Sequence, residues 1–266
     1  MPSPFMEASP VHLSTCPVAE LHGCDLVFVA AGVPQMAGES RLSLVQRNVA
    51  VFQGLFPALS RANPRATIVI VTNPVDVMTR VALELSGHPP ERLLGTGTLL
   101  DSGRFRQLLS EHLSVTPRNI HAHVVGEHGD HEVLVWSRTL VGPFTLDEYC
   151  RRSGVAFDQA DRARIDRDVR QAAYQIIERK GATHFAIGQA CARLAQALAR
   201  PMTTLLTVSR RLEGQHCLEG ICLSLPVPVN EHGVGSSLEL DMTAEELAAF
   251  LRGAEVIEAA YAKLGL

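Results

Sequence analysis

Residues 25–32 read DLVFVAAG, a continuous apolar run that ends at a glycine. A strand of a parallel sheet has this character, because helices cover both of its faces. Two further runs of the same kind follow, at 67–71 (TIVIV) and 93–94. Segments with apolar residues at helical spacing separate the three runs, at 42–59 and 75–85. The alternation predicts an α/β fold with a parallel sheet and crossover helices.

The second half of the chain has a different order of elements. Helical patterns lie at 104–113, 158–180 and 185–199, and strand-like segments at 120–126, 133–140, 205–208 and 221–229. A last helix opens with Thr243 and Glu246, which have the spacing of a capping box. We therefore expect two domains, an α/β domain over residues 1–97 and an α+β domain over residues 98–266.

The composition excludes several classes of protein. The 266 residues carry a net charge of −4, which provides no basic field for nucleic acid. No apolar run reaches the roughly 18–20 residues of a membrane helix, and the start lacks the order of a signal peptide. The six cysteines are scattered, with no CxxC pair, which favours reduced thiols in the cytoplasm over a disulfide framework.

Residues 124–130 read VVGEHGD and place a histidine between two carboxylates and two glycines. An imidazole titrates near pH ~6.5, so His128 is a candidate acid–base group whose tautomer a carboxylate can fix. The cluster with His121, His123 and His131 raises a metal site as an alternative. The chain has no HExxH motif and no cysteine near the cluster, so we expect no metal.

Three other polar stretches follow strands or begin helices, namely GESRLSLVQRNV at 38–49, TNPVD at 72–76 and LDSGRFR at 100–106. Ligands of α/β proteins bind at the carboxyl ends of parallel strands, so these stretches are candidates for a site. Each one alone is equally well read as a turn, a helix cap or a solvated face.

Five motifs together resemble one family in order and spacing: AGVPQMAGESRLSLVQRN, TNPVD, GTGTLLDSGRFR, GEHGD and KGATHFAIG. They are similar to the lactate/malate dehydrogenases, and most of all to the bacterial L-lactate dehydrogenases. The resemblance runs from about Ala19 to Lys263, and it implies an NAD-dependent 2-hydroxyacid dehydrogenase that interconverts lactate and pyruvate, with roles in glycolysis and fermentation.

The resemblance also implies the catalytic residues. His128 takes the hydroxyl proton of lactate, or returns it during pyruvate reduction, and Asp101 orients the imidazole and favours its protonated form. Arg41 polarises the developing alkoxide. The loop at 34–41 closes over the substrate and excludes water.

The remaining substrate contacts follow from the same motifs. Arg104 grips the substrate carboxylate with its planar guanidinium, Asn73 bonds the reacting oxygen, and Thr183 lines the pocket. Gln35 meets the far end of the substrate, where malate enzymes usually have arginine. A neutral side chain there leaves the second carboxylate of malate unpaired, so we favour lactate over malate.

For the cofactor, the resemblance implies contacts on the nicotinamide side of NAD, from Gly32, Val33, Val71, Thr72, Asn73, Thr96 and Ile187. The sequence contains no GxGxxG loop, and it enters the family pattern near Pro4–Phe5, about 60 residues into it. We therefore expect an incomplete doubly wound (Rossmann-type) sheet. The strand at 25–31 then lies at an edge, and NAD binds weakly.

The resemblance finally implies partners. Arg106 and His121 match positions that bind fructose 1,6-bisphosphate between subunits, and members of this branch are homotetramers; an intersubunit ion pair of Arg106 is the alternative. Three other functions stay open at this point: a malate dehydrogenase, a non-catalytic subunit or fragment of the family, and, weakest, a metal hydrolase that uses the histidine cluster.

Overall fold

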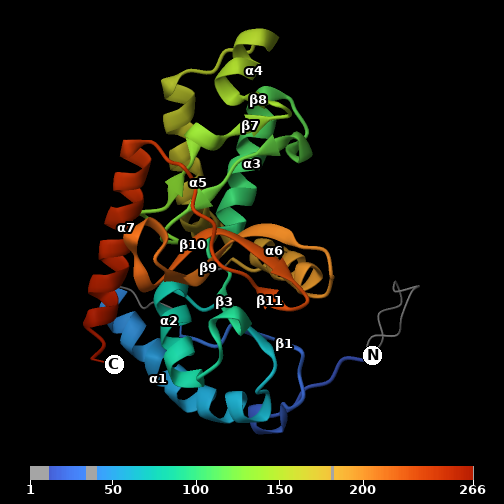
Figure 1. The fold of residues 1–266 in the computed structure, drawn as a ribbon, viewed down its shortest axis with the longest axis vertical. Coiled ribbons are helices and arrows are strands. Elements are labelled where there is room, and N and C mark those ends of the chain that lie inside the picture. Colours follow the sequence, from blue (N-terminus) through green and yellow to red (C-terminus); the bar gives the residue numbers. More distant parts are fainter. Residues whose placement is uncertain (1–11, 34–40, 181–182, 266) are drawn as a thin grey trace.

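The computed structural model describes residues 12–33, 41–180 and 183–265 of the chain. Its elements form three levels, which Figure 1 shows from end to end. The strands β7 and β8 and the helix α4 lie at one end, β1 and α1 lie at the other, and β9, β10 and α6 lie between them. No helix within the described ranges combines the length and the apolar character that a bilayer crossing requires.

Six strands form the main sheet, in the order β1-β2-β3-β9-β10-β11. Their bounds are β1 Leu26–Val29, β2 Thr67–Ile70, β3 Leu93–Gly95, β9 Thr204–Glu213, β10 Glu219–Asn230 and β11 Gly233–Val234. The first three are parallel, which confirms the predicted α/β sheet. Among the described residues, β1 pairs only with β2, so it is an edge strand as expected.

The antiparallel part differs from the prediction in one respect. The predicted strands at 205–208 and 221–229 are present as the antiparallel pair β9 and β10, and β9 also joins the parallel sheet through a pair between Gly95 and Ser209. β9 is also longer than the predicted 205–208, because it forms a two-stranded ribbon with β10 along most of its length. The sheet is therefore continuous from β1 to β11.

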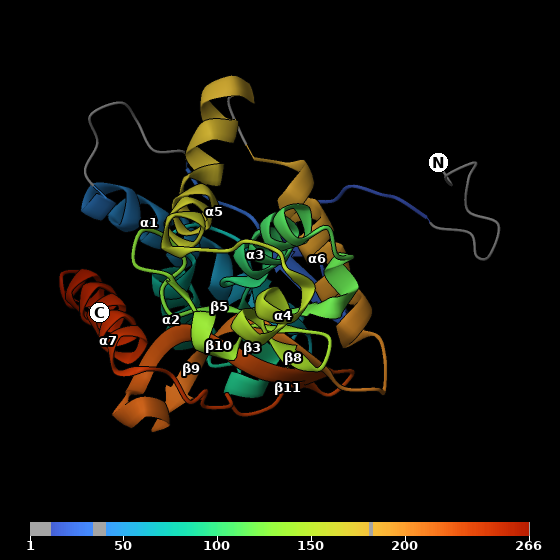
Figure 2. The same ribbon diagram turned by 90° about the horizontal axis from the view of Figure 1, so that it is seen from above.

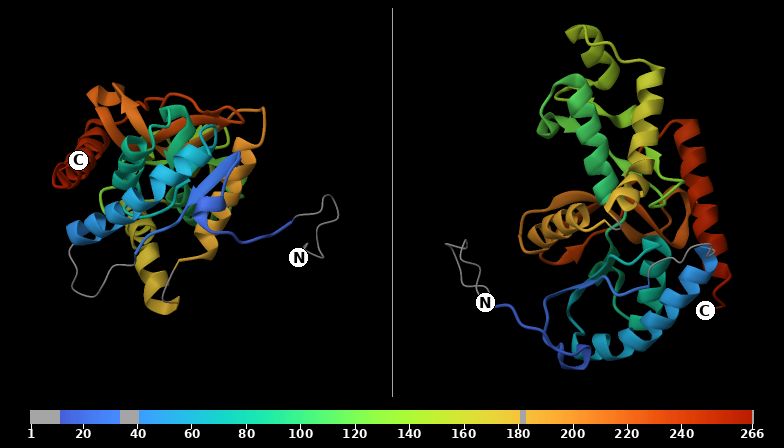
Figure 3. Two further views of the ribbon diagram at one scale, coloured as in Figure 1. Left: turned by 90° about the horizontal axis from the view of Figure 1, so that it is seen from below. Right: turned by 180° about the vertical axis from the view of Figure 1, so that it is seen from behind.

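Seven helices pack around the strands in the described part of the chain. Their bounds are α1 Arg41–Ala62, α2 Val75–Ser86, α3 Leu99–Leu113, α4 Leu146–Ser153, α5 Gln159–Lys180, α6 Phe185–Leu198 and α7 Ala244–Ala262. Seen from above, α3 lies between α5 and α6, and it contacts both (Figure 2). The last helix, α7, runs along the side of the molecule, from the level of α5 to that of α1 (Figure 3).

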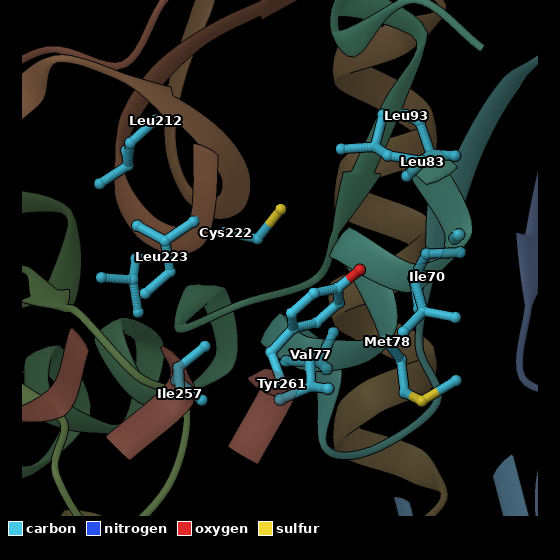
Figure 4. Packing of buried hydrophobic residues seen from close by; sticks show 14 of the residues in the cluster. Ile70, Val77, Met78, Leu83, Leu93, Leu212, Cys222, Leu223, Ile257 and Tyr261 are labelled. Carbon is cyan, nitrogen blue, oxygen red and sulfur yellow. The ribbon is translucent and has the colours of Figure 1, made fainter. Parts of the chain in front are cut away.

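Alternating side chains place the core on both faces of the sheet. In β2, Ile68 and Ile70 pack into the cluster that contains α1, α2 and α7, whereas Val69 packs into the cluster with α6. Figure 4 shows the first cluster, where Ile70 of β2 and Met78 of α2 lie near Tyr261 of α7. Helices thus cover both faces, which explains the continuous apolar runs of the sequence.

Short strands build the end that carries the VVGEHGD motif. They are β4 Ile120–His121, β5 Val124–Val125, β6 Val133–Leu134, β7 Leu140–Val141 and β8 Phe144–Thr145. β5 and β6 pair around the motif, as predicted. The predicted strand at 133–140 is interrupted by a 3₁₀ turn at Trp136–Arg138, and only its two ends lie in strands, in β6 and at Leu140 of β7. The Trp136 ring meets the Phe105 ring edge-on, with 4.6 Å between the ring centroids.

Two helix starts are informative. Thr243 and Glu246 form the complete capping box predicted for α7. α3, however, begins at Leu99 rather than at the predicted 104. The polar sequence Asp101-Ser102-Gly103 resembles a turn, but all three residues lie within the first turns of the helix. Asp101 and Arg104 lie one turn apart on the same helix, as their spacing in LDSGRFR predicts.

The turn between β3 and α3 fixes the position of that helix. Gly97 has a φ of +50°, and a Cβ there would lie 2.3 Å from Ser224 Oγ and 2.4 Å from the backbone nitrogen of Ser209. We expect Gly97→Ala to lower the free energy of unfolding by about 2–5 kcal/mol, because overpacking adds to the strain of a left-handed alanine. Urea unfolding measures the loss.

Gly103→Ala is the matched control. Gly103 lies inside α3, and no atom lies within 4 Å of a Cβ built there. An alanine in a helix stabilises it by up to about 1 kcal/mol relative to glycine. Equal stability of the two variants would contradict the close packing at Gly97.

Candidate active site

Two turns at the carboxyl end of the parallel strands meet the VVGEHGD turn. The loop after β2 carries Asn73, and the turn after β3 leads into α3 with Asp101 and Arg104. The opposite side comes from the β5–β6 turn, which Gly126 anchors to β10 through two backbone hydrogen bonds with Ser224, 2.8 and 3.0 Å long. Segments that are distant in the sequence therefore converge on one point.

His128 and Asp101 form the centre of the site. The Nδ1 atom of His128 lies 2.6 Å from Oδ2 of Asp101. The other carboxylate oxygen of Asp101 accepts a hydrogen bond from Nη1 of Arg104 at 2.9 Å. The Asp101 side chain is only 3% exposed, so two cationic groups compensate a carboxylate that water does not solvate.

This environment keeps a proton on the imidazole. Burial lowers the pKa of His128, but the charge and hydrogen bond of Asp101, together with the charges of Glu132 and Asp76, raise it to about 9. Burial raises the pKa of Asp101, yet the charges of His128 and Arg104 and the hydrogen bond to His128 hold the pKa of that carboxyl below its usual range. An ionised Asp101 beside a protonated His128 is the resulting state at neutral pH.

Asp76 holds the backbone of the same turn. The N–H of His128 donates to Oδ2 of Asp76 at 2.7 Å, from the first turn of α2. Burial raises the pKa of this carboxyl to about 6. The TNPVD motif was predicted to lie near a ligand, but no role was predicted for its aspartate. Its place in a strand-end motif was the only signal in the sequence.

The neighbouring carboxylates of the turn have other partners. Glu127 is buried, and its Oε2 accepts hydrogen bonds from the backbone N–H of His131 at 2.8 Å and from its ring at 2.9 Å. Asp130 accepts a hydrogen bond from the hydroxyl of Tyr174 at 3.0 Å. The partner of His128 is thus Asp101, 27 positions earlier, rather than either adjacent carboxylate.

A cavity of about 390 Å³ opens beside the pair. Four residues predicted for the site line it, namely Asn73, Asp101, Arg104 and His128. Sequence reasoning missed several other lining residues, among them Leu44, Glu132, Arg170 and Tyr174. Larger hollows lie elsewhere in the described part of the chain, near α4, α5 and α7, between β1 and α6, and between α3 and α6, and none of these contains His128.

Three predicted substrate residues are not seen in this cavity. Gln35 lies outside the described residues, as does most of the loop at 34–41. Arg41 is the first residue of α1, but its side chain is also outside the description. Leu44, three positions further along that helix, does line the cavity, so the start of α1 faces the site. Thr183 is described but is not among the lining residues.

The residues predicted for the nicotinamide side lie on the loops after the parallel strands. Asn48 of α1 joins two of these loops, since its Oδ1 accepts from the N–H of Val33 at 2.8 Å and its Nδ2 donates to the carbonyl of Asn73 at 2.9 Å. A Cβ on Gly32 would lie 2.6 Å from Cγ2 of Thr72, so only glycine fits the loop at this point. Sequence reasoning missed Asn48.

The other predicted cofactor residues complete the same edge of the sheet. Val71 and Thr72 follow β2 directly, Thr96 follows β3 and is buried, and Ile187 packs from α6 against the cluster on that face. Hydroxyl groups and apolar side chains at the ends of adjacent parallel strands are a donor set that fits the nicotinamide end of a dinucleotide.

Arg106 and His121 lie in a cationic cluster away from this cavity. Burial and the nearby Arg193 lower the pKa of Arg106 to about 10, and its Nη1 donates to the carbonyl of Ala122 at 3.0 Å. Burial, Arg106 and His121 also lower the pKa of His123, to about 4. The cluster gathers positive groups from α3, β4 and α6.

The histidine cluster of the sequence does not assemble in the described residues. The one group of three potential metal ligands there consists of Asp101, His128 and Glu132, without His121, His123 or His131. Both oxygens of Asp101 already bond cationic protein groups. The arrangement favours proton transfer over metal binding.

The raised pKa of His128 predicts a pH dependence of stability. Its pKa rises from 6.5 to about 9 on folding, so the contribution is complete below pH 6.5 and is lost as the pH rises through 9. We expect the free energy of unfolding to fall by about 3 kcal/mol across this window in the unaltered protein, and much less in His128→Asn. Urea unfolding at a series of pH values measures both; parallel curves would contradict the assignment.

Two models of one protein family match the chain. Residues 3–95 match the family model of the lactate/malate dehydrogenase NAD binding domain. Residues 98–263 match the model of the alpha/beta C-terminal domain of the same family.

Individual proteins similar to nearly the whole chain are L-lactate dehydrogenases. The L-lactate dehydrogenase of Thermus aquaticus is 46% identical over 263 residues, which cover 99% of this chain and 84% of that protein. That of Thermoanaerobacter pseudethanolicus is 43% identical with the same coverage. Among solved structures, the minor L-lactate dehydrogenase from Enterococcus mundtii superposes with a TM-score of 0.89 at 34% identity, covering 94% of this chain and 79% of that one. The chain belongs to the lactate/malate dehydrogenase family.

Proposed function

We propose that this protein is an NAD-dependent L-lactate dehydrogenase, which interconverts (S)-lactate and pyruvate by hydride transfer. The observation that carries the proposal is the buried His128–Asp101 hydrogen bond beside Arg104 in one cavity. A proton donor next to a guanidinium is the pair of groups that a 2-keto acid requires. The identity to L-lactate dehydrogenases over nearly the whole chain supports this substrate class.

His128 serves as the acid in pyruvate reduction. Asp101 occupies Nδ1 of the ring, so the proton that reaches the keto oxygen comes from Nε2. A pKa of about 9 keeps the imidazole protonated in the free protein at neutral pH, ready for the reductive direction. In lactate oxidation the neutral ring takes the hydroxyl proton, and Asp101 then stabilises the imidazolium that forms.

The surrounding residues bind and orient the substrate. Arg104 pairs with the substrate carboxylate through its planar guanidinium, while it keeps its bond to Asp101. Asn73 bonds the reacting oxygen. Arg41 polarises that oxygen from the start of α1, and Thr183 lines the pocket beside the substrate; both of these roles rest on the family resemblance.

The loops after β1, β2 and β3 hold the nicotinamide end of NAD, which supplies or accepts the hydride when bound. Gly32 and Val33 form one wall, fixed by Asn48. Val71, Thr72, Asn73 and Thr96 form the edge of the sheet, and Ile187 covers it from α6. The match of residues 3–95 to the NAD binding domain of the family supports this choice of cofactor.

Gln35 sets the choice between lactate and malate. A neutral side chain at the far end of the substrate accommodates the methyl group of pyruvate, whereas the second carboxylate of oxaloacetate needs a cation. This assignment rests on the aligned motif AGVPQMAGES, and it favours a lactate over a malate enzyme.

Regulation and assembly extend the proposal. Arg106 and His121 bind fructose 1,6-bisphosphate at a contact between subunits of a homotetramer, and the nearby guanidinium of Arg193 supports a polyanion there. The domains divide at 97/98, which the limits of the two family models support. Six free cysteines support a cytoplasmic location.

An assay of keto acid reduction tests the function. NADH oxidation with pyruvate should exceed that with oxaloacetate by at least about tenfold, because the unpaired carboxylate costs more than about 1.4 kcal/mol in a closed pocket. His128→Asn should lower turnover by about 10²-fold or more, with NADH affinity unchanged, since only the acid is lost.

Two results would contradict the proposal. Preference for oxaloacetate would identify a malate dehydrogenase instead. No turnover of either keto acid by the folded protein would favour a non-catalytic member of the family.

A further inference from the structure

Glu132 is a buried carboxylate of the active-site cavity to which the mechanism above gives no role. It follows the VVGEHGD turn, directly before β6, and is only 2% exposed. Its Oε1 has no hydrogen-bond partner among the described residues. One of its oxygens lies within 4.8 Å of ligand atoms of both Asp101 and His128.

Such a side chain is costly unless its charge interacts favourably. A buried carboxylate without hydrogen bonds loses the solvation that water gives it. Glu127, on the same turn, avoids this cost by bonding His131, and Asp101 avoids it by bonding His128 and Arg104. For Glu132, the nearest compensation is the electrostatic field of the cations around it.

Those cations come from three elements. The charge of His128 on the turn, that of Arg170 on α5 and that of Arg104 on α3 all favour the ionised form of Glu132. Arg170 itself bonds Asp166 and the carbonyl of Asp130, and no hydrogen bond joins it to Glu132 among the contacts of the described residues. The imidazolium of His128 therefore shares a cavity with a second acid, whose Oε1 has no hydrogen-bond partner among the described residues.

We propose that Glu132 is a positioning residue of the proton-transfer site: its buried carboxylate, acting on His128 from beside Asp101, helps to hold the catalytic proton on the imidazole. This inference rests on the proposed function, in which that proton is delivered to the keto oxygen. Asp101 orients the ring through a hydrogen bond, whereas Glu132 acts through space.

The titration of the three groups supports a shared proton. Glu132 and Asp76 both add to the raised pKa of His128. Burial and Asp101 in turn raise the pKa of Glu132 well above its usual range. Acids that interact this closely titrate as one unit, so a change at Glu132 appears at His128.

The sign of the effect follows. Without the Glu132 charge, His128 loses its proton at lower pH. Pyruvate reduction needs the imidazolium, so the pH above which this activity declines moves down. Lactate oxidation needs the neutral ring, so the pH above which it begins also moves down. A purely structural role for Glu132 changes the stability of the turn but moves neither limb.

Titration of the His128 ring by NMR, with no substrate present, tests the inference. In Glu132→Gln the midpoint should fall by about one pH unit. Glutamine has nearly the same size as glutamate, but it has no charge that favours the imidazolium. Glu132→Met provides a second neutral variant in case the first does not fold. Glu132→Asp keeps the charge, so the His128 midpoint should stay close to that of the wild type.

Asp130→Asn is the matched control. It removes the same charge from the same turn, but Asp130 is exposed and water screens it, so the His128 midpoint should stay within about 0.2 pH unit of the wild type. The alkaline limb of kcat/KM for pyruvate should follow the NMR midpoints in all variants.

The outcomes separate the inference from the proposed function. A folded neutral variant, Gln or Met, that titrates at the wild-type midpoint overturns the role of Glu132, as does an equal shift in Asp130→Asn. If the unaltered protein reduces no keto acid, the proposed function fails, while the substrate-free titration still decides whether Glu132 acts on His128.

Discussion

The structure depends most on one buried carboxylate, that of Asp101. An ionised carboxyl group that water does not reach must be compensated by the protein, and here His128 and Arg104 each bond one of its oxygens. The requirement joins the first turn of α3 to the β5–β6 turn. It also orients both groups that a keto acid needs, a proton donor and a carboxylate anchor, toward the same cavity. The bonds that compensate the Asp101 charge therefore also bring His128 and Arg104 together in the site.

The rest of the fold positions this carboxylate. Gly97 lets the chain pass closely against β9 and β10 before α3 begins, and Asp76 fixes the backbone of His128 from α2. Asn48 connects the loops after β1 and β2, where the cofactor residues lie. These contacts explain why the continuous sheet matters for function: the strands that form the core also end at the cavity.

The site concentrates buried acids at some cost in stability. Asp76 and Glu132 each have a carboxylate oxygen without a partner among the described residues, and burial raises the pKa of both. Unsatisfied buried groups of this kind are unfavourable for folding, but both of these acids raise the pKa of His128. Acid groups that stabilise the imidazolium are what a proton donor for pyruvate requires.

The sequence predicts the parts of the structure that depend on local patterns. Apolar runs located β1 and β2, and the spacing of Thr243 and Glu246 located the start of α7. The pairing of Asp101 with His128 came from the family motifs, since no local pattern joins residues so far apart. Asp76, Asn48 and Glu132 escaped prediction because their roles arise only from tertiary contacts. The helix α3 begins at Leu99, five residues before the predicted helical pattern at 104–113.

The most direct test of this account is the titration of the His128 ring in Asp101→Asn. The amide can still accept a hydrogen bond, but it carries no charge, so burial becomes the dominant influence on the imidazole. We predict that the pKa of His128 falls from about 9 to 6.5 or below. A value that stays near 9 in this variant would contradict the central claim that the buried Asp101 carboxylate keeps the catalytic proton on the His128 ring.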